Sequence, residues 1–281
     1  VPQNISLEKL IDYKPESEMK SGKHKWIKSD TQPVFMEPLN YVKTEQVGKN
    51  DFLYHHNHCP AVTWTPNGDL LAIWFSTEEE TGREMTIVSS RLKSKGKDWT
   101  VPSLFFKVPD RNMTGSSLFF DEQQNVIYHM NGVEAAGTWQ NLAMVMRTSH
   151  DNGYSWTAPV FANAEHQQGN QVIAGMFKTR EGWLIQPCDA TPKVKGGSVI
   201  HISKDNGKNW YNPSKTLRIT PDFKEGNTGG IIAGIHTGIV QLKNGNLFAL
   251  GRNDNIKKDN TFYMPISIST NMGESWSYSA G

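Results

Sequence analysis

Residues 149–156 read SHDNGYSW, a Ser-x-Asp-x-Gly-x-x-Trp pattern that returns along the chain. It recurs as SKDNGKNW at 203–210 and as STNMGESW at 269–276, where Asn271 stands in place of the acidic residue. A degenerate copy, LKSKGKDW at 92–99, keeps only the glycine and the tryptophan. The four tryptophans are 57, 54 and 66 residues apart, a period that indicates a solenoid, a propeller or an array.

Each copy, which we call a turn box, has the chemistry of a tight turn. Asp and Asn side chains hydrogen-bond to backbone groups two residues on, and glycine adopts a positive φ at no steric cost. The tryptophan gives the turn a hydrophobic anchor. We therefore expect the boxes to be structural and any function to lie elsewhere in the repeat.

The composition excludes several classes of partner. The 281 residues carry 29 basic against 28 acidic side chains, so neither nucleic acid nor an anionic membrane surface is expected to bind. No run of 18 apolar residues predicts a membrane span. No basic-then-apolar leader is present, so an export signal is either absent or already removed.

Residues 51–281 divide into repeats of four short strands. In the first repeat, two apolar runs flank Pro66-Asn67-Gly68-Asp69, which predicts a hairpin. Three more repeats follow, and the last is expected to lack its fourth strand because it ends at Gly281. Such units are typical of propeller blades, so the predicted fold class is all-β, a β-propeller of four-stranded blades with turn boxes.

Only about four blades can be counted, whereas propellers close with roughly four to eight. Either the chain is a truncated piece of a larger ring, or residues 1–50 supply a fifth blade. Within this N-terminal segment, SLEKLIDY at 6–13 is predicted to be a short helix and QPVFMEPL at 32–39 an outer, ring-closing strand.

The repeats predict a ring of polar residues around one end of the propeller axis. In a meandering blade, the start of the first strand and the end of the second lie at the same end, and repetition gathers equivalent positions into a ring. The candidates from strand ends are His58, Thr114, Gln171, His236, Ser76, Asn131, Asp189 and Arg252. The second-to-third loops, among them NIKKDN at 255–260, add Arg83, Glu84 and Trp139.

Structural explanations stand beside these functional ones. His56 and His58 are equally explained as hydrogen-bonding histidines under a loop, and Arg83 with Glu84 as an exposed ion pair worth little. For His129 a structural role is favoured. Cys59 and Cys188 lie near the same ring, but no CxxC or HxxxH spacing supports a metal site, and no cofactor is expected.

The repeats resemble the Asp-box or BNR repeats of sialidases. HNHCPAVTWTPNGDLLAIWFS, GREMTIVSSRL, NQVIAGMF, GWLIQPCDA and GIHTGIVQLKNGNLFALGR together resemble the sialidase-like BNR family of secreted or periplasmic bacterial proteins, over about residues 55–281. The resemblance implies a propeller of six or seven blades and a secreted or periplasmic location. It does not fix an activity, because one fold hosts many functions.

The resemblance also shows departures from true sialidases. Their first blade begins with Arg-Ile-Pro, whereas this chain reads His58-Cys59-Pro60, and the tyrosine nucleophile is not evident. The candidate carboxylate clamps are Arg83, Arg147 and Arg252. Relatives with a similar propeller cleave rhamnose–glucuronate linkages, by hydrolysis or as ulvan-type lyases, and use histidine, which His58 fits better.

Two hypotheses follow. In the first, the protein is an enzyme acting on an acidic oligosaccharide or polysaccharide: Arg83 and Arg252 hold a carboxylate, His58 or His236 transfers the proton, and Trp139 stacks on a sugar. The remaining expected binding residues are Glu84, Asn131, Gln171 and Asp189. In the second, the same ring belongs to a non-catalytic propeller that binds carbohydrate or protein.

Overall fold

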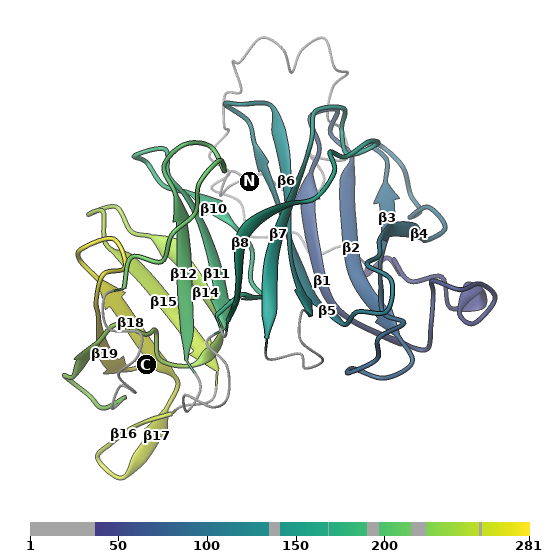
Figure 1. Ribbon diagram of the computed structural model, residues 1–281. Helices are drawn as coiled ribbons and strands as arrows, with labels where there is room; N and C mark the ends of the chain where they lie inside the picture. The colour runs from purple at the N-terminus through teal and green to yellow at the C-terminus, as the bar shows by residue number, and fades with distance from the viewer. Residues whose placement is uncertain (1–36, 135–140, 168, 190–196, 215–222, 253–254) are drawn as a thin grey trace. The chain divides into compact units, whose positions relative to one another are not determined.

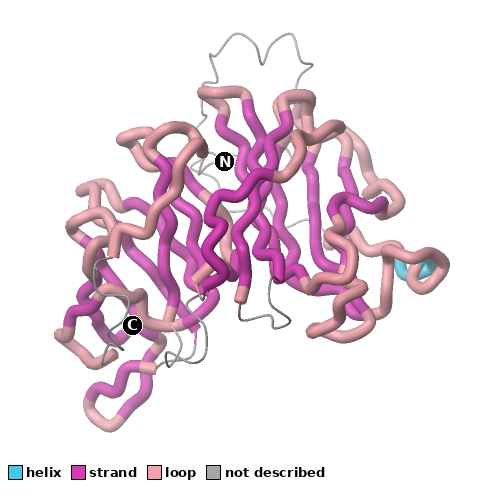
Figure 2. The backbone as a smooth tube through the Cα atoms, viewed as in Figure 1, coloured by secondary structure: helices cyan, strands magenta, loops and turns pink. Residues whose placement is uncertain are grey.

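The computed structural model describes residues 37–134, 141–167, 169–189, 197–214, 223–252 and 255–281. These residues form almost only β-strands and loops, with one short 3-10 helix, η1 (Thr44–Gln46), and strands dominate the trace in Figure 2. The strands make four sheets of four or five strands and one two-stranded sheet (Figure 1). The predicted all-β class is confirmed.

The first sheet is the meander that the sequence predicts. Its strands follow in the order β1 (His56–Trp64), β2 (Leu70–Thr77), β3 (Thr86–Leu92) and β4 (Ser103–Phe106). The first hairpin closes between Thr65 and Asp69, where Gly68 has a φ of 83° and its N–H donates to the Thr65 carbonyl at 2.9 Å. The Pro-Asn-Gly-Asp turn is therefore confirmed as a hairpin.

The second and third sheets repeat this order with different completeness. The second sheet consists of β5 (Met113–Asp121), β6 (Val126–Glu134), β7 (Leu142–Ser149) and β8 (Val160–Gln167). The third consists of β9 (Gln171–Val172), β10 (Phe177–Lys178), β11 (Leu184–Asp189) and β12 (Ser198–Ser203), with β9 and β10 both pairing β11. In its described part, the expected outer strand is reduced to a bridge between Ile202 and Tyr211.

The fourth sheet corrects the prediction that its last strand is missing. It contains β13 (Thr228–Gly229), β14 (Ile235–Gln241), β15 (Leu247–Arg252), β18 (Pro265–Ser269) and β19 (Trp276–Ala280), in the order β13-β19-β18-β15-β14. The strand β19 begins at the box tryptophan itself. The predicted loop at 255–260 is also wrong, because β16 (Ile256–Lys258) and β17 (Thr261–Tyr263) form a separate two-stranded sheet.

The chain divides into two compact units, which we describe separately. The first contains the chain up to Asp110, Leu118–His129 and Arg147–Ala158, and the second contains Arg111–Ser117, Met130–Met146 and Pro159–Gly281. Strands of the second sheet contribute to both.

The N-terminal segment covers part of the first core. Trp74 and Val88 are fully buried, and Tyr41 contacts the Trp74 ring edge-on at 5.0 Å between centroids. Residues 37–39 of the predicted outer strand have no regular structure, while residues 32–36 and the predicted helix at 6–13 lie outside the described residues. The division at residue 50 stays a prediction.

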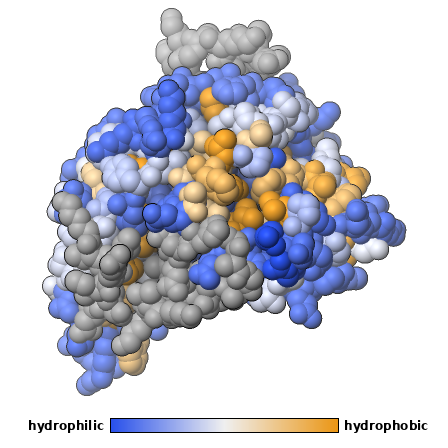
Figure 3. All heavy atoms as spheres, in the orientation of Figure 1, coloured by the Kyte–Doolittle hydropathy of each residue, from blue (hydrophilic) through white to orange (hydrophobic). Residues whose placement is uncertain are grey.

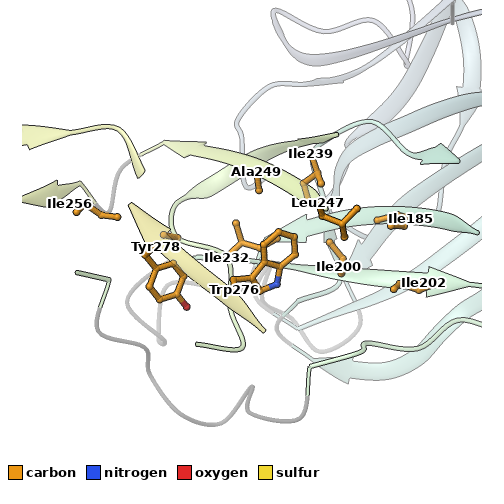
Figure 4. Close-up of a cluster of buried hydrophobic side chains, with 11 residues drawn as sticks. Ile185, Ile200, Ile202, Ile232, Ile239, Leu247, Ala249, Ile256, Trp276 and Tyr278 are labelled. Atoms are coloured by element: carbon orange, nitrogen blue, oxygen red, sulfur yellow. The ribbon is translucent and has the colours of Figure 1, made fainter. Parts of the chain in front are cut away.

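The core of the second unit is aliphatic with one central tryptophan. Trp276 is 1% exposed and lies among isoleucines and leucines from β11, β12, β14 and β15 (Figure 4). Ile256 from β16 and Tyr278 from β19 extend this cluster. The tryptophan of the fourth box is thus a core residue, as the hydrophobic anchor of the box predicts.

The turn boxes are closed by their own side chains. In the second box, the Ser149 hydroxyl donates to Asp151 Oδ1 at 2.8 Å and accepts the Gly153 N–H at 2.9 Å. Asp151 Oδ1 also accepts the Ser155 N–H at 2.8 Å. Hydrogen bonds, led by that from the Ser155 hydroxyl, lower the pKa of Asp151 to about 2. The box at 203–210 and the box at 269–276 repeat this network, the latter with an amide oxygen in place of the carboxylate.

The second box also ties its sheet to the first. Asn152 Oδ1 accepts the Asn67 N–H at 2.9 Å, and its carbonyl accepts Arg91 Nη2 at 2.7 Å. A Cβ at Gly153, whose φ is 76°, would lie 2.9 Å from Leu71 Cδ2. Glycine therefore supplies the positive φ of the turn, and a Cβ at this position would also require the Leu71 side chain to move.

The third and fourth sheets are joined at the equivalent places. A Cβ at Gly273 would lie 2.4 Å from Ile200 Cδ1, so the fourth box packs on the third sheet. Between the hairpin turns, Arg180 donates from Nη1 to the Lys243 carbonyl at 2.7 Å and from its backbone to Gln241 Oε1 at 2.9 Å. The boxes thus have the structural role that the sequence predicts.

A buried cation lies among aromatic rings in the first unit. The Arg147 guanidinium packs over the rings of Phe105, Phe106 and Trp156, and its Nε donates to His129 Nδ1 at 3.3 Å. Burial lowers the pKa of Arg147 to about 10, and burial together with the arginine charge holds the pKa of His129 well below its usual value. Arg147 is therefore a packing residue, not the exposed carboxylate clamp that the sequence left open.

The surface carries isolated apolar side chains among polar ones. On the face shown in Figure 3, orange apolar residues lie between blue polar regions. The outer strand β8 exposes Phe161 by 66%, and the ribbon of β16 and β17 exposes Phe262 by the same fraction.

We expect Asp151→Ala to destabilise the fold by about 1 kcal/mol, because the turn loses the acceptor that holds its backbone. Asp151→Asn should cost clearly less, since Asn271 makes the same bonds in the fourth box. Urea unfolding of the two variants and the parent protein measures both losses. Equal losses for Ala and Asn would contradict the role given to the acceptor oxygen.

The two fully buried histidines predict acid sensitivity. Burial lowers the pKa of His129 and of His201 in the folded state, so below about pH 6.5 the unfolded chain binds protons that the folded chain does not. The free energy of unfolding should therefore fall as the pH drops from 7.5 to 5.5, by up to about 1.4 kcal/mol per pH unit for each histidine. Thermal unfolding across this range should show a smaller slope for His129→Gln and an unchanged slope for His150→Ala, whose parent residue is exposed. An unchanged slope in His129→Gln would refute the assignment.

Candidate functional site

A histidine–aspartate pair stands at the end of β11 and the start of β14. His236 Nδ1 lies 2.8 Å from Asp189 Oδ2, and the His236 backbone N–H donates to Asp189 Oδ1 at 2.7 Å. The aspartate side chain is 5% exposed and the histidine side chain 26%. Although the distance suits a hydrogen bond, its angle is poor, and within the described residues Nδ1 has no well-aligned partner. The contact is therefore mainly electrostatic.

The ring of His236 is held with one edge buried. Its Nδ1 is buried against the carboxylate, so the exposed part of the side chain lies on the other edge of the ring. This is the arrangement in which a carboxylate fixes the orientation of an imidazole. The free edge can then exchange a proton with a bound molecule.

Two buried hydroxyls support the aspartate. Ser198 faces Asp189 across the β11–β12 pairing. Its hydroxyl lies 3.2 Å from Asp189 Oδ1 and 2.9 Å from the Gly234 carbonyl oxygen and can donate to either acceptor. The Thr237 hydroxyl donates to Ser198 Oγ at 2.7 Å. Neither hydroxyl was singled out from the sequence. Ser198 follows a loop and Thr237 follows the histidine, so only the strand register identifies them as partners of Asp189.

The backbone at His236 is bulged. His236 has a φ of 53°, and the β14–β15 register shifts between Ile235 and Gly238. A bulge takes a residue out of the ladder and redirects its side chain. The preceding Gly234 lies against Gly251, where a Cβ would come within 2.7 Å of the neighbouring Cα. The histidine is therefore positioned by backbone geometry that side chains larger than hydrogen would disrupt.

Two more predicted residues lie next to this pair. Gln171 is paired with Asp189 across β9 and β11, so their side chains emerge on the same face of the sheet. Arg252 is exposed and pairs with Ile235, the neighbour of His236. Gln171, Asp189 and His236 are thus brought together in the second unit, and Arg252 lies on the neighbouring strand opposite the residue before His236.

Asn131 occupies a different environment. Its side chain is fully buried, and Nδ2 donates to Ser116 Oγ at 3.0 Å and to the Gly115 carbonyl at 3.4 Å. These bonds tie β6 to β5 inside the second sheet. Its assignment to substrate stays a prediction, and Trp139, the predicted stacking residue, lies outside the described residues.

The predicted residues of the first unit form a second group. His58 is exposed, and its ring contacts those of His56 and Phe75 at 5.8 and 5.6 Å between centroids. In the first sheet the register shift begins after His58, and the residue with a positive φ is Cys59, at 51°. His58 therefore corresponds to Ile235, whereas Cys59 corresponds to His236.

Arg83 is already engaged by a carboxylate. Its Nε donates to Asp110 Oδ1 at 3.0 Å, and its Nη2 donates to Asp110 Oδ2 at 3.2 Å and to the Asp110 carbonyl at 2.6 Å. The two side chains are 39% and 78% exposed, so the pair is solvated and easily separated. Arg83 thus has the geometry to hold a carboxylate in a two-pronged contact.

Glu84 does not pair with Arg83 in the way considered from the sequence. Its Oε1 accepts the Thr77 hydroxyl at 2.5 Å and the Glu78 N–H at 2.8 Å, and these bonds outweigh burial and lower the pKa of Glu84. The carboxylate therefore holds its own loop. Its assignment to substrate binding stays a prediction.

The described residues contain no group of three or more His, Cys, Asp or Glu side chains that could hold a metal ion. Neither Cys59 nor Cys188 is in a disulfide. Burial, with a smaller effect of the Asp189 charge, raises the pKa of Cys188 well above its usual value, and its sulfur lies 3.8 Å from Met144 Sδ. Cys188 is therefore an unreactive core thiol.

No helix in the described part of the chain is long and apolar enough to cross a membrane.

Comparisons with known proteins identify a family that the sequence matches. A family model described as "BNR repeat-like domain" matches residues 68–280. No curated protein matches the chain.

Solved structures show the same fold. A Hadza microbial sialidase is 16% identical with a TM-score of 0.59, over 79% of this chain and 46% of its own. A protein of unknown function from Dyadobacter fermentans is 14% identical with a TM-score of 0.58, over 80% of this chain and 69% of its own. An intramolecular trans-sialidase from Ruminococcus gnavus, in complex with oseltamivir carboxylate, is 13% identical with a TM-score of 0.58, over 81% of this chain and 71% of its own.

At these identities the likeness shows the fold alone, a β-propeller. The chain spans about half the length of the Hadza sialidase, covering 46% of it.

The Arg83–Asp110 pair predicts a gain of affinity on mutation. Under the acidic-glycan hypothesis drawn from the sequence, we expect Asp110→Asn to bind a carboxylate-bearing sugar about twofold to fivefold more tightly, because an exposed ion pair of up to about 1 kcal/mol no longer competes for Arg83. Calorimetric titration measures the change, and Asp98→Asn, at another exposed aspartate, is the matched control. Unaltered binding in Asp110→Asn would argue that Arg83 does not contact the sugar.

Proposed function

The chain belongs to the BNR repeat-like family, and we propose that it is an enzyme acting on an acidic glycan, with the Asp189–His236 pair as its proton-transfer group. The observation that carries this proposal is the 2.8 Å approach of a nearly buried carboxylate to a partly exposed histidine. Several solved proteins of the same fold are named sialidases, and one of them binds oseltamivir carboxylate. A carboxylate-bearing sugar is therefore the ligand class that we infer.

The pair favours His236 over His58 as the proton carrier. A carboxylate beside Nδ1 orients the imidazole, so that the nitrogen on the other edge of the ring can face a bound sugar and exchange a proton with it. Among the described residues, the contacts of His58 are to the rings of His56 and Phe75, and no carboxylate orients it. We retain His58 as a sugar-contacting residue of the first unit.

The neighbours of the pair have the chemistry to hold an acidic sugar. Arg252 carries an exposed guanidinium, which binds carboxylates through paired, charge-assisted hydrogen bonds. Gln171 offers both donors and acceptors for hydroxyl groups on the face that it shares with Asp189. In the proposal Arg83 acts in the same way as Arg252, while Trp139 provides a stacking surface.

Two reactions are compatible with this arrangement. In uronate elimination, neutral His236 takes the C5 proton, the C4–O bond breaks, a C4=C5 double bond forms, and the leaving oxygen gains a proton. Neutralising the uronate carboxylate by arginine acidifies the C5 proton. In hydrolysis, protonated His236 instead donates its proton to the leaving oxygen while water adds to the sugar. The carboxylate of Asp189 holds the imidazole in place in either case.

A non-catalytic glycan-binding propeller is the second candidate. It is favoured by the first unit, where Arg83 and Glu84 make internal contacts and no oriented acid–base pair stands among the described residues. The two candidates differ in one outcome, which is product formation.

We also propose a secreted or periplasmic location. The support is the resemblance of the chain to secreted and periplasmic members of the sialidase-like family, together with the proposed extracellular type of substrate.

The proposed role predicts a large loss of activity in His236→Ala. Incubation with ulvan-type and sialylated substrates, followed by the ultraviolet absorbance of unsaturated product or by released sugar, should show a fall of about 10² to 10⁴ in kcat. Asp189→Asn should lower kcat more than it raises KM, because the imidazole loses its orienting charge. His150→Ala, in an exposed turn, is the matched control.

Each outcome separates the candidates. Product formed by the parent protein and lost in His236→Ala supports the enzyme. Binding without product on every acidic glycan favours the non-catalytic propeller. Full activity in His236→Ala with loss in His58→Ala would move the proton-transfer role to the first unit.

A further inference from the structure

The ribbon of β16 and β17 is a rigid element inserted between β15 and β18. Lys258 and Thr261 face each other across a two-residue turn, in which Asp259 and Asn260 have φ values of 48° and 60°. Positive φ at both central residues is the geometry of the tightest hairpin turns, whose twist matches that of the strands. The ribbon projects from the lower end of the fourth sheet in Figure 1.

One face of the ribbon is fastened to the body of the second unit. Ile256 is fully buried in the cluster around Trp276 and Tyr278 (Figure 4). On the same face, Lys258 Nζ lies 3.4 Å from Glu225 Oε1, and Glu225 Oε2 accepts the Ala280 N–H at 2.6 Å. The direction of the ribbon is therefore set by packing and by hydrogen bonds.

The opposite face presents an aromatic ring beside a cation. Lys257 and Phe262 are directly paired, so their side chains emerge on the same face, whereas their neighbours in each strand emerge on the other. Phe262 is 66% exposed and Lys257 is exposed, and the following Met264 is 50% exposed. Among the described residues no anion pairs with Lys257.

The base of the ribbon stands at the functional end of the fourth sheet. β15 ends at Arg252, which pairs with Ile235 next to His236, and three residues separate the end of β15 from the start of the ribbon at Ile256. A glycan bound at His236 and Arg252 can therefore continue onto the ribbon. An apolar sugar face stacks on an aromatic ring, and a sugar carboxylate complements a lysine.

We propose that the Lys257–Phe262 face is a distal subsite for a further acidic sugar of the same glycan chain. This inference rests on the proposed function, because the glycan must first be held by the His236 group. It makes the protein selective for chain length: a polymer contacts both places, whereas a short oligosaccharide contacts only the first.

The test compares long and short ligands of one chemistry. Binding of ulvan polymer is measured by electrophoresis in gels that contain it, and binding of an ulvan disaccharide by calorimetry. Phe262→Ala should weaken binding of the polymer about fivefold and leave binding of the disaccharide unchanged. Lys257→Gln should weaken binding of the polymer about twofold to fivefold at low salt and much less at high salt.

Two control variants test whether the effect is specific to the Lys257–Phe262 face. Phe161→Ala removes an aromatic ring of the same 66% exposure on another strand, and Lys243→Gln removes an exposed lysine at the turn between β14 and β15. Both should bind the polymer like the parent protein. All four positions are exposed, and thermal unfolding confirms that each variant is folded.

The outcomes are distinct. If the parent protein binds both ligands and Phe262→Ala loses nothing on the polymer, the subsite is refuted while the proposed function stands. Equal losses in Phe161→Ala and Phe262→Ala also refute it. If the parent protein binds neither the polymer nor the disaccharide, both the subsite and the proposed function fail for this glycan class.

Discussion

A serine hydroxyl that donates to one side chain and accepts two backbone N–H groups closes each intact turn box, and the sheets depend on this closure. Ser149, Ser203 and Ser269 all make the same three bonds. The bonds satisfy the backbone of a turn that faces solvent, and they leave the following glycine free to adopt a positive φ. In the second and fourth boxes that glycine packs against the neighbouring sheet, where a Cβ would displace the end of the Leu71 or the Ile200 side chain.

The repeats made most of the fold predictable, because each box marks a turn at a fixed place between strands. The predictions failed for strands whose positions the box pattern does not specify. The last strand at Trp276 was missed since it begins at the box itself, and the ribbon at 256–263 since its strands are only three residues long. Arg147 was a candidate carboxylate clamp, yet its guanidinium packs over three aromatic rings. The spacing of residues in the sequence does not predict such packing.

The sequence predicted where the candidate site lies better than it predicted which residues contact each other there. Gln171, Asp189, His236 and Arg252 were expected at equivalent strand ends. Strand pairing and the histidine–aspartate contact bring the first three together, and Arg252 pairs with Ile235, the neighbour of His236. The specific contact of His236 with Asp189 could not be predicted, because it depends on a bulge that shifts the register by one residue. The same shift explains why His58 and His236, alike in sequence position, are not equivalent in the two sheets.

The box that joins two sheets has an evolutionary consequence. Asn152 and Gly153 lie within the repeated segment, yet their contacts are with the preceding sheet. A tandem duplication of one repeat therefore copies the box side of the joint together with the blade. Gain of a whole repeat then requires a matching surface only on the sheet that precedes it.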